Sequence, residues 1–246
     1  MNIAVVGSGI SGLAAAWLLK EKHQVTLYEA AGYPGGHTNT VEVTLDGITY
    51  PVDTGFLVYN TLTYPNLISL FDHLGVETHK TEMSFSVNLA ASDIEWAGSS
   101  LTTVFGQKRN ILRPRFWKML KDIMSFNARA EKLLQMCEAD RMTLGQLLKK
   151  QGYSRWFSDW YLLPMAAAIW SASPRDILNF PAATFLRFCL NHHLLQVKAR
   201  PEWRSVLGGA RNYVQRMVED LDVQLSHPID RVTRGNEGVE LISGDR

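Results

Sequence analysis

The chain has 246 residues, of which 46% are hydrophobic and 20% are charged, and its formal net charge at pH 7 is +1. This length can bury a substantial core in one large domain or two smaller ones. The near-neutral charge, with only short basic clusters such as Lys108–Arg109, argues against a nucleic-acid partner. Cys137 and Cys189 match no metal-binding or redox spacing, so we expect two reduced thiols in the core and no metal site.

The start of the chain bears on its location. Met1 and Asn2 lead directly into an apolar run, without the charged region of a signal peptide. The segment "LAAAWLL" is too short to span a bilayer and is followed at once by "KEKHQ". We therefore expect a cytoplasmic protein without a transmembrane segment, and peripheral contact with a membrane stays open.

The first 29 residues predict a strand, a glycine turn, a helix and a second strand. Ile3–Val6 is an apolar run bounded by glycine, which is typical of a strand buried on both faces. Val25–Tyr28 predicts a second short strand that ends at Glu29. Between them, apolar residues recur at helical spacing, namely Ile10, Leu13, Ala14, Trp17 and Leu18. This pattern indicates a βαβ unit.

The next segments predict a hairpin, a helix and further strands. "TVEVTL" and "ITYPVDTG" flank Asp46–Gly47, a dipeptide suited to a two-residue type I′ turn. Thr63 and Pro65 then open a helix that Gly75 closes. Residues 84–97 alternate weakly and predict one or two strands.

From Arg113 to about Leu195 the pattern is mainly helical. Thr143 and Gln146 form a capping box at the start of one helix, and Gly152 can end it. The aromatic and methionine-rich segment "RWFSDWYLLPMAAAIW" has two interpretations. It packs as ordinary core, or it lines a cavity for an apolar substrate.

The last forty residues predict one more helix and three short strands. Gly208 and Gly209 precede the helix, and strands are expected over residues 223–225, 229–233 and 239–242, the last two around "GNEG". Several polar residues are expected to have no catalytic role. They are His192 and His193, which point in different directions on a helix, Asp53, expected in a structural hydrogen bond, and Lys198 and Arg200, expected on the surface.

The three glycines after the first strand predict a nucleotide site. Gly7 permits a sharp turn, Gly9 lets the backbone approach a pyrophosphate, and Gly12 allows close packing of helix on strand. Glu29 ends the second strand, where an acid can accept hydrogen bonds from ribose hydroxyls. The alternative is a tight turn without a ligand. These features do not distinguish FAD from NAD as the ligand. The further pair Gly35–Gly36 would let the chain pass close to a bulky ligand.

At this point the sequence resembles a known family. "VVGSGISGLAAAWLL", "VTLYEAAGYPGGHTNT" and "VDTGF" resemble the N-terminal signature of the flavin-containing amine oxidase superfamily, which includes protoporphyrinogen oxidases and phytoene desaturases. Within it, the chain is similar to bacterial FAD/NAD-binding amine-oxidase-like proteins described beside fatty-acid-modifying enzymes. "RPEWRSVLGGARNYVQRMVEDL" and "HPIDRVTRGNEGVEL" resemble the return from the substrate domain to the FAD domain.

The resemblance implies an α/β fold with a Rossmann-like FAD-binding domain of the two-dinucleotide-binding-domain type. A largely helical α+β substrate domain would be inserted into it. The expected boundaries are 1–60 and 206–246 for the FAD-binding domain, the second part incomplete, and 61–205 for the substrate domain.

The resemblance also implies roles for particular residues. Backbone atoms of the first turn would line the pyrophosphate, at Gly7, Gly9, Ile10, Ser11 and Gly12. Glu29, with Ala30 beside it, would hold the adenosine ribose, and Ile229 would meet the adenine through its backbone. The region of the diphosphate, ribityl chain and flavin ring would be lined by Gly36, His37, Thr54, Gly55 and Phe56.

The function implied is that of an FAD-dependent oxidoreductase, which transfers a hydride from an amine or an apolar C–H substrate to the flavin. No catalytic residue is identified. One alternative is a flavin-dependent lipid or isoprenoid desaturase or isomerase. Another, from a different class, is a nucleotide-binding module without catalysis.

Two departures from the family pattern matter. The family often has arginine where this chain has His37, and because histidine titrates near neutrality we expect a pH-dependent contact with phosphate. The family also has a C-terminal segment that adds a strand to the parallel sheet and a glycine-containing helix. Nothing after residues 239–242 matches it, so we expect a fragment of a longer protein rather than a site completed by a partner.

Overall fold

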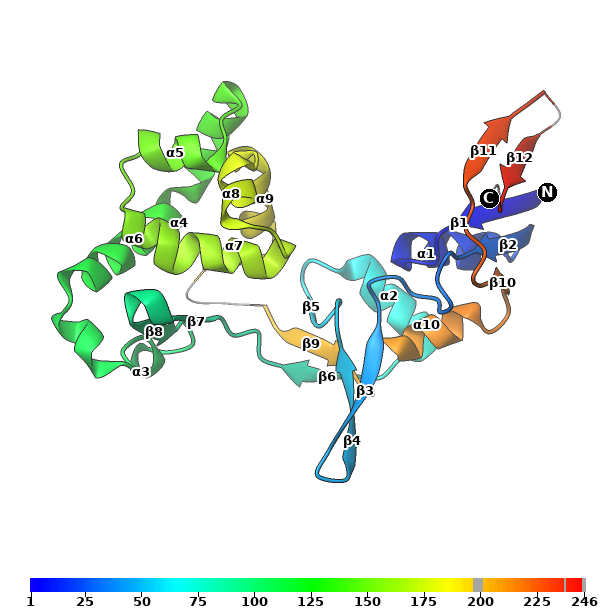
Figure 1. Ribbon diagram of the computed structural model, residues 1–246, viewed down its shortest axis with the longest axis horizontal. Helices are drawn as coiled ribbons and strands as arrows, with labels where there is room; N and C mark the ends of the chain where they lie inside the picture. The colour runs from blue at the N-terminus through cyan, green and yellow to red at the C-terminus, as the bar shows by residue number, and fades with distance from the viewer. Residues whose placement is uncertain (197–200, 237, 245–246) are drawn as a thin grey trace. The chain divides into compact units, whose positions relative to one another are not determined.

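The chain folds into two units, and the first begins with the predicted βαβ unit. The computed structural model describes residues 1–196, 201–236 and 238–244, coloured along the chain in Figure 1. By their contacts the residues separate into two units, Met1–Glu82 with Glu202–Arg246, and Met83–Pro201.

A three-stranded parallel sheet forms the centre of the first unit. Its strands, in spatial order, are β1 (Asn2–Val6), β2 (Gln24–Tyr28) and β10 (Asp222–Gln224). Ile3 lies opposite Val25, and Val223 lies opposite Leu27. Parallel neighbours need a crossover connection, and helix α1 (Ile10–Leu19) supplies it between β1 and β2.

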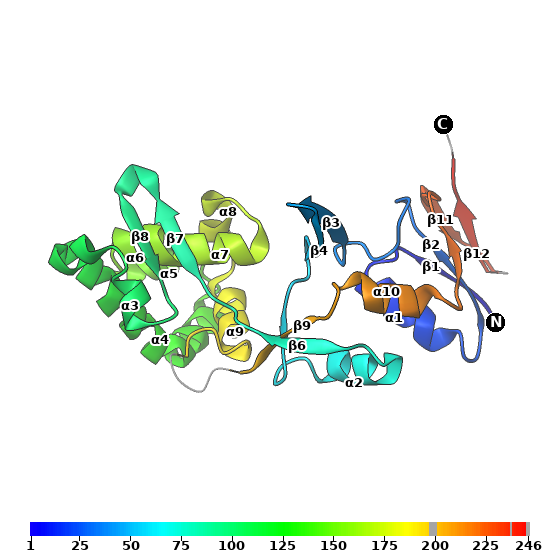
Figure 2. The same cartoon turned by 90° about the horizontal axis from the view of Figure 1, so that it is seen from below.

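Two further helices complete this unit's core. α1 and α10 (Arg211–Val218) lie side by side in both Figure 1 and Figure 2, and α10 also contacts α2 (Pro65–Leu74). As predicted, α2 has proline in its first turn and ends at Gly75, whose φ of 65° is left-handed. The residues buried between helices and sheet include Leu13, Ala16, Leu27, Phe71, Tyr213 and Met217.

A small antiparallel sheet fixes where the first unit ends. Its strands, in spatial order, are β5 (Tyr59–Asn60), β9 (Trp203–Val206) and β6 (Thr78–Thr81). Thr78 lies opposite Val206, so residues 61–82 pack with the first unit. Division by packing therefore differs from the expected boundary at residue 60, and the functional domains stay a prediction.

The predicted hairpin at Asp46–Gly47 is confirmed. Strands β3 (Thr40–Leu45) and β4 (Ile48–Asp53) pair with Leu45 opposite Ile48. Asp46 and Gly47 have φ values of 51° and 77°, the two positive angles that a type I′ turn requires. One face of the hairpin carries only large apolar side chains, all exposed, namely Val41, Val43, Leu45, Ile48, Tyr50 and Val52.

The end of the described chain forms a second hairpin. Its strands are β11 (Arg231–Arg234) and β12 (Val239–Ile242). The expected strand over residues 229–233 therefore begins two residues too early. Ile229 lies in an irregular segment before β11, because pairing with β12 begins only at Arg231, opposite Ile242.

The second unit is mainly helical. Residues 84–97 form two paired strands, β7 (Ser86–Leu89) and β8 (Ile94–Ala97), joined by the 3-10 turn η1 (Ala90–Ser92). The helices that follow are α3 (Leu101–Val104), the 3-10 helix η2 (Lys108–Leu112), α4 (Pro114–Asp140), α5 (Leu144–Lys150), α6 (Arg155–Phe157), the π-helical turn η3 (Ser158–Leu162), α7 (Leu163–Trp170), α8 (Pro174–Asn179) and α9 (Ala182–Asn191). The predicted capping box is present: the Thr143 hydroxyl accepts from the Gln146 N–H at 3.3 Å, and the Gln146 side chain accepts from the Thr143 N–H at 2.9 Å.

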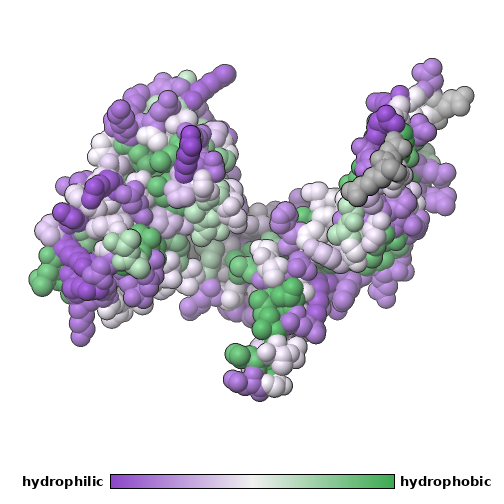
Figure 3. Space-filling view, in the orientation of Figure 1, coloured by the Kyte–Doolittle hydropathy of each residue, from purple (hydrophilic) through white to green (hydrophobic). Residues whose placement is uncertain are grey.

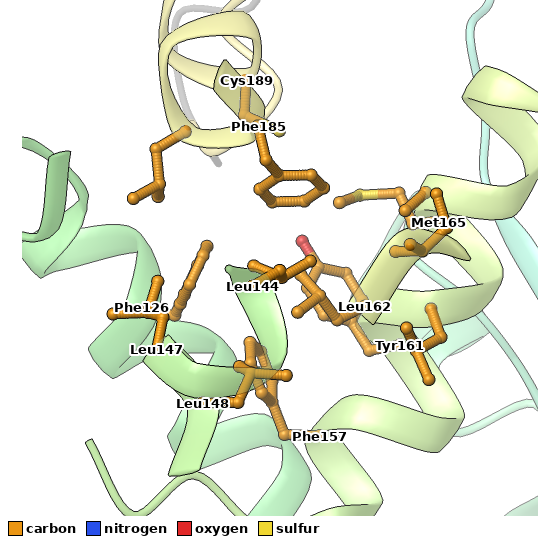
Figure 4. Close-up of a cluster of buried hydrophobic side chains, with 14 of the residues drawn as sticks. Phe126, Leu144, Leu147, Leu148, Phe157, Tyr161, Leu162, Met165, Phe185 and Cys189 are labelled. Atoms are coloured by element: carbon orange, nitrogen blue, oxygen red, sulfur yellow. The ribbon is translucent and has the colours of Figure 1, made fainter. Parts of the chain in front are cut away.

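The aromatic segment packs into the core of this unit. Trp160 and Tyr161 are 9% and 7% exposed, and Phe157 and Leu162 are fully buried. Figure 4 shows part of this cluster, with Phe126, Leu144, Leu147, Leu148, Phe157, Tyr161, Leu162, Met165, Phe185 and Cys189 labelled. This packing supports the interpretation as ordinary core, and the lining of a substrate cavity stays a prediction. Cys137 and Cys189 are buried and free, as expected, and burial raises the pKa of Cys189 to about 12.

The glycines of the first turn allow a test of the fold. An alanine Cβ at position 12 would lie 1.9 Å from the Gly7 carbonyl oxygen, whereas a Cβ at position 9 would meet nothing within 4 Å. Gly9 also has φ of −61° and ψ of 168°, which alanine adopts freely. We expect Gly12→Ala to lower the free energy of unfolding by about 2 kcal/mol or more, and Gly9→Ala by less than about 1 kcal/mol. Denaturant unfolding of both variants checks this, and equal losses would contradict the close packing of α1 on β1.

Candidate functional site

The candidate site begins at the turn between β1 and α1. Gly7 has φ of 94°, in the left-handed region that favours glycine, and its N–H donates to the Tyr28 carbonyl at 2.8 Å. Gly12 sits so close to the Gly7 carbonyl that no side chain fits. The first turn of α1 is therefore held against the end of β1, while the space beside Gly9 stays open.

The start of α1 offers free backbone donors. Among the described residues no side chain caps this helix, and its first turn holds no acidic residue. The first N–H groups of a helix lack partners within the helix and carry a partial positive charge. Open space beside Gly9 and uncapped donors together fit an anionic phosphate group.

Glu29 lies beside this turn, at the end of β2. One carboxylate oxygen accepts from the Ser8 backbone N–H at 2.8 Å and from the Ser8 hydroxyl at 2.5 Å. The other accepts from the Ala31 N–H at 2.8 Å. Burial raises the pKa of Glu29, but hydrogen bonds from Ala31, Ser8 and Ala30 outweigh it and hold the pKa below its ordinary value. The carboxylate is therefore ionised and held in place at neutral pH.

The second glycine pair packs directly on the first turn. Gly35 forms a parallel bridge with Gly9, and its N–H donates to the Ser8 hydroxyl and carbonyl, both at 3.1 Å. An alanine Cβ at Gly36 would lie 3.1 Å from the Gly9 Cα. The structure thus brings the two predicted glycine motifs together into one patch of bare backbone.

The predicted residues near the flavin also meet through their backbones. The Phe56 N–H donates to the His37 carbonyl at 3.4 Å, and a Cβ at Gly55 would lie 2.1 Å from that same oxygen. The Thr54 N–H donates to Asn39 at 2.9 Å. The side chains of His37 and Thr54 are exposed. These residues form one surface with Gly36, while their contact with a cofactor stays a prediction.

Asp53 has the structural role expected for it. Its carboxylate accepts from the Thr40 hydroxyl at 2.5 Å and from the Ala210 N–H at 2.8 Å. The Thr40 hydroxyl in turn accepts from the Arg211 N–H at 3.0 Å. These bonds fix the hairpin against the start of α10. The sequence does not indicate the structural roles of Thr40 and Ser8, because the spacing of residues does not predict which group a hydroxyl bonds to.

Ile229 is the predicted site residue least tied to the others. The chain just before it runs beside the end of β2, where the His227 N–H donates to the Glu29 carbonyl at 2.8 Å and the Ser226 N–H donates to the Ala31 carbonyl at 2.9 Å. Ile229 itself is half-buried in the irregular segment. The structure places it near the glutamate end of the site, but not in a strand.

Other polar candidates lie outside the site. His192 stacks on Phe188 with ring centroids 4.0 Å apart, and His193 follows the end of α9 with φ of 54°. Lys198 and Arg200 fall outside the described residues. Over those residues that the structure describes, no group of three potential metal ligands occurs, and no helix is long and apolar enough to cross a membrane.

Comparison with known proteins decides the family. The model of the family described as flavin containing amine oxidoreductase matches residues 10–246. The chain belongs to this family. Its members' cofactor is a flavin, in agreement with the resemblance of the first 60 residues.

Among curated proteins, the chain is similar in sequence to two kinds of oxidase. It is 34% identical to protoporphyrinogen oxidase 2 of Arabidopsis thaliana over 132 residues, which are 48% of this chain and 24% of that protein. It is 23% identical to the probable polyamine oxidase 4 of the same plant over 254 residues, which cover 98% of this chain and 47% of that protein.

Solved structures of similar fold cover nearly the whole chain. Cyclohexylamine oxidase from Brevibacterium oxydans matches 100% of it, with 21% identity and a TM-score of 0.73. Putrescine oxidase bound to putrescine also matches 100%, with 22% identity and a TM-score of 0.67. The chain spans 55% and 56% of those two proteins, so it covers about half the length of its relatives. At this identity the likeness shows the Rossmann-like, FAD-binding type of fold.

The hydrogen bonds of Glu29 generate a prediction for cofactor binding. In Glu29→Gln an amide NH₂ replaces one acceptor oxygen and cannot accept from Ser8 or from a ribose hydroxyl. We expect the affinity for FAD at neutral pH to fall about tenfold, roughly 1.4 kcal/mol, as measured by quenching of flavin fluorescence. Because the pKa of Glu29 is lowered, this difference should persist through mildly acidic buffer and shrink only as the pH falls through that lowered value. The matched control is Glu21→Gln, at an exposed position; equal affinities of the Glu29 and Glu21 variants would contradict the role of Glu29.

Proposed function

We propose that this chain holds FAD in the patch of bare backbone around Gly9 and forms the cofactor-binding part of an FAD-dependent, amine-oxidase-like oxidoreductase. The observation that carries the proposal is the open space beside Gly9. It is bordered by the uncapped start of α1, by Gly36 and by the end of β2 at Glu29. A turn that served packing alone would need glycine at positions 7 and 12, but not at 9.

Each predicted residue has a role in this proposal. Main-chain groups of Gly7, Gly9, Ile10, Ser11 and Gly12 bind the pyrophosphate. Glu29 and Ala30 bind the adenosine ribose, and the backbone at Ile229 meets the adenine. The backbone around Gly36, His37, Thr54, Gly55 and Phe56 passes along the diphosphate, the ribityl chain and the flavin ring. The bound flavin supplies the chemistry, as acceptor of a hydride from the substrate.

The chain's own residues contribute orientation rather than proton transfer in this proposal. Ser8, Gly35 and Asp53 hold the strand ends, the glycine pair and the hairpin in fixed positions. A prearranged set of donors binds a cofactor without a further cost of ordering. We assign no catalytic base, and the largely helical unit carries the substrate in this proposal.

An amine is the substrate class that the comparisons favour over a lipid or isoprenoid. Polyamine, putrescine and cyclohexylamine oxidases are among the similar proteins. The packed aromatic core of the second unit supports ordinary packing of that segment over a cavity for an apolar substrate. A cytoplasmic location is part of the same proposal, and the two free, buried cysteines support it, because they fit a reducing compartment.

The visible spectrum of the purified chain tests the proposal. Expressed with ample riboflavin, the protein should be yellow, and the flavin bands should bleach anaerobically with an amine such as putrescine or cyclohexylamine. Gly9→Ala should come out folded but without flavin, because its Cβ occupies the space left for the pyrophosphate. A colourless protein that cannot take up FAD would overturn the proposal, and a colourless one that binds ADP-ribose would support the non-catalytic module. A yellow protein that no amine bleaches would support FAD binding but contradict an amine as the substrate.

His37 should make the binding of FAD depend on pH. A protonated imidazole attracts phosphate and a neutral one does not, so the affinity for FAD should be higher in acidic than in alkaline buffer. His37→Ala should show a flat profile over this range, whereas His79→Ala, which changes an exposed histidine on β6, should keep the parent's profile. A parent profile that is already flat, or one unchanged in His37→Ala, would show that the His37 side chain does not reach the phosphate.

A further inference from the structure

An exposed apolar surface lies on the helical unit, where α3, η2 and the first half of α4 meet. We call it the α3–α4 surface, and it consists of Leu101, Ile111, Leu112, Trp117 and Met124 together with Lys108 and Lys121. Leu112, Leu101 and Met124 are 85%, 80% and 72% exposed, and Trp117 is half exposed. In Figure 3 hydrophobic and hydrophilic residues are intermixed over this part of the molecule. Exposed apolar residues in such number on one surface mark an interaction site.

Contacts join these residues into one surface. The Trp117 indole N–H donates to the Ile111 carbonyl at 2.8 Å, which holds η2 beside the start of α4. The rings of Phe105 and Trp117 lie 5.3 Å apart, and the Phe105 N–H donates to the Leu101 carbonyl at 3.2 Å. Along α4, Trp117, Lys121 and Met124 recur at a spacing of four and three residues and so share one face.

The charge of this surface is positive. Residues 101–124 contain six cationic side chains and one acid, Asp122, which is buried and paired with Lys118. Asp93, which lies outside this range, pairs with Arg109 and with Arg113. Within the described parts of the chain, Lys108 and Lys121 have no ion-pair partner. Arg115 lies on the other side of α4, 5.7 Å from the ring of Trp156, and is not part of the surface.

The position of Lys121 separates a membrane from a protein as partner. It lies on the same helix face as Trp117 and Met124, in the middle of the apolar set. The buried centre of a protein–protein interface is depleted of lysine. At a bilayer surface, lysine instead extends its charged end to the lipid headgroups while its methylene groups lie among apolar chains. Tryptophan is also enriched at that level of the bilayer.

We propose that the α3–α4 surface docks reversibly on an anionic lipid bilayer. Leu101, Leu112 and Met124 would enter the boundary between headgroups and acyl chains, while Lys108 and Lys121 attract the negative surface. This docking uses no residue of the proposed flavin site, so it stands or falls independently of FAD binding.

Flotation of the full chain with lipid vesicles tests the docking. We expect the protein to float with vesicles that contain phosphatidylserine, to float about tenfold less with pure phosphatidylcholine, and to be released by high salt. Leu112→Ser should weaken flotation about tenfold, and Lys108→Glu combined with Lys121→Glu at least as much. Met124→Ser is a second apolar variant, at another position with little packing.

Two control variants make equivalent changes elsewhere. Leu62→Ser replaces an exposed leucine of the other unit, and Lys132→Glu reverses an exposed charge further along α4. Both should float as the parent does. The thermal unfolding midpoint of each variant, expected to match that of the parent, shows that it is folded.

Several results would overturn the proposal. They are a parent protein that does not float, equal binding to neutral and anionic vesicles, and unchanged flotation of the Leu112 and Met124 variants. Sedimentation supplies a further one. If the parent self-associates, and Leu112→Ser abolishes that association without affecting flotation, the surface is a contact between copies of the chain.

Discussion

The contact between Gly12 and the Gly7 carbonyl is the constraint on which the candidate site depends. Because no side chain separates them, α1 starts directly at the end of β1, with its unpaired N–H groups next to the strand end. Any larger residue would push the helix away and carry those donors with it. The open space beside Gly9 can bind an anion only while this contact keeps the start of α1 in place. Packing of helix on strand and the capacity to bind an anion are therefore two results of one close approach.

Ser8 extends this constraint to two other segments, the end of β2 and the second glycine pair. Its side chain is fully buried, and its hydroxyl donates to Glu29 and accepts from the Gly35 N–H. A buried hydroxyl costs little when both its donor and its acceptor are used. The same bonds keep Glu29 ionised, since they outweigh the effect of burial on its pKa. They contribute stability above the ordinary pKa of a glutamate, and this contribution is lost as the pH falls through the lowered value.

The local elements were predictable because their signals are local. The Asp46–Gly47 turn, the capping box at Thr143 and the glycine end of α2 each depend on residues within a few positions of one another. The pairing of β6 with β9 joins residues more than 120 positions apart, and neither segment contains a local signal that predicts its partner strand. That pairing is why residues 61–82 pack with the sheet unit. The sequence predicts a strand at Ile229 for a related reason. Its apolar neighbours fit a strand, but the register with β12 fixes where pairing begins. The glycine and glutamate positions of the site follow from spacing, whereas the hydroxyls that orient them depend on side-chain contacts made only in the folded chain.

Two exposed apolar surfaces among the described residues differ in a way that bears on what can cover each. The hairpin face of β3 and β4 consists of six apolar side chains in register, with its charged residues, such as Glu42 and Asp53, on the opposite face. Such an uncharged, alternating face has the composition of the interior of packed sheets. The α3–α4 surface instead has lysine among its apolar residues, which a packed interior does not accommodate. A lysine can remain there only where its charged end reaches water or headgroups. The placement of charge, rather than the amount of exposed apolar area, therefore distinguishes the two surfaces.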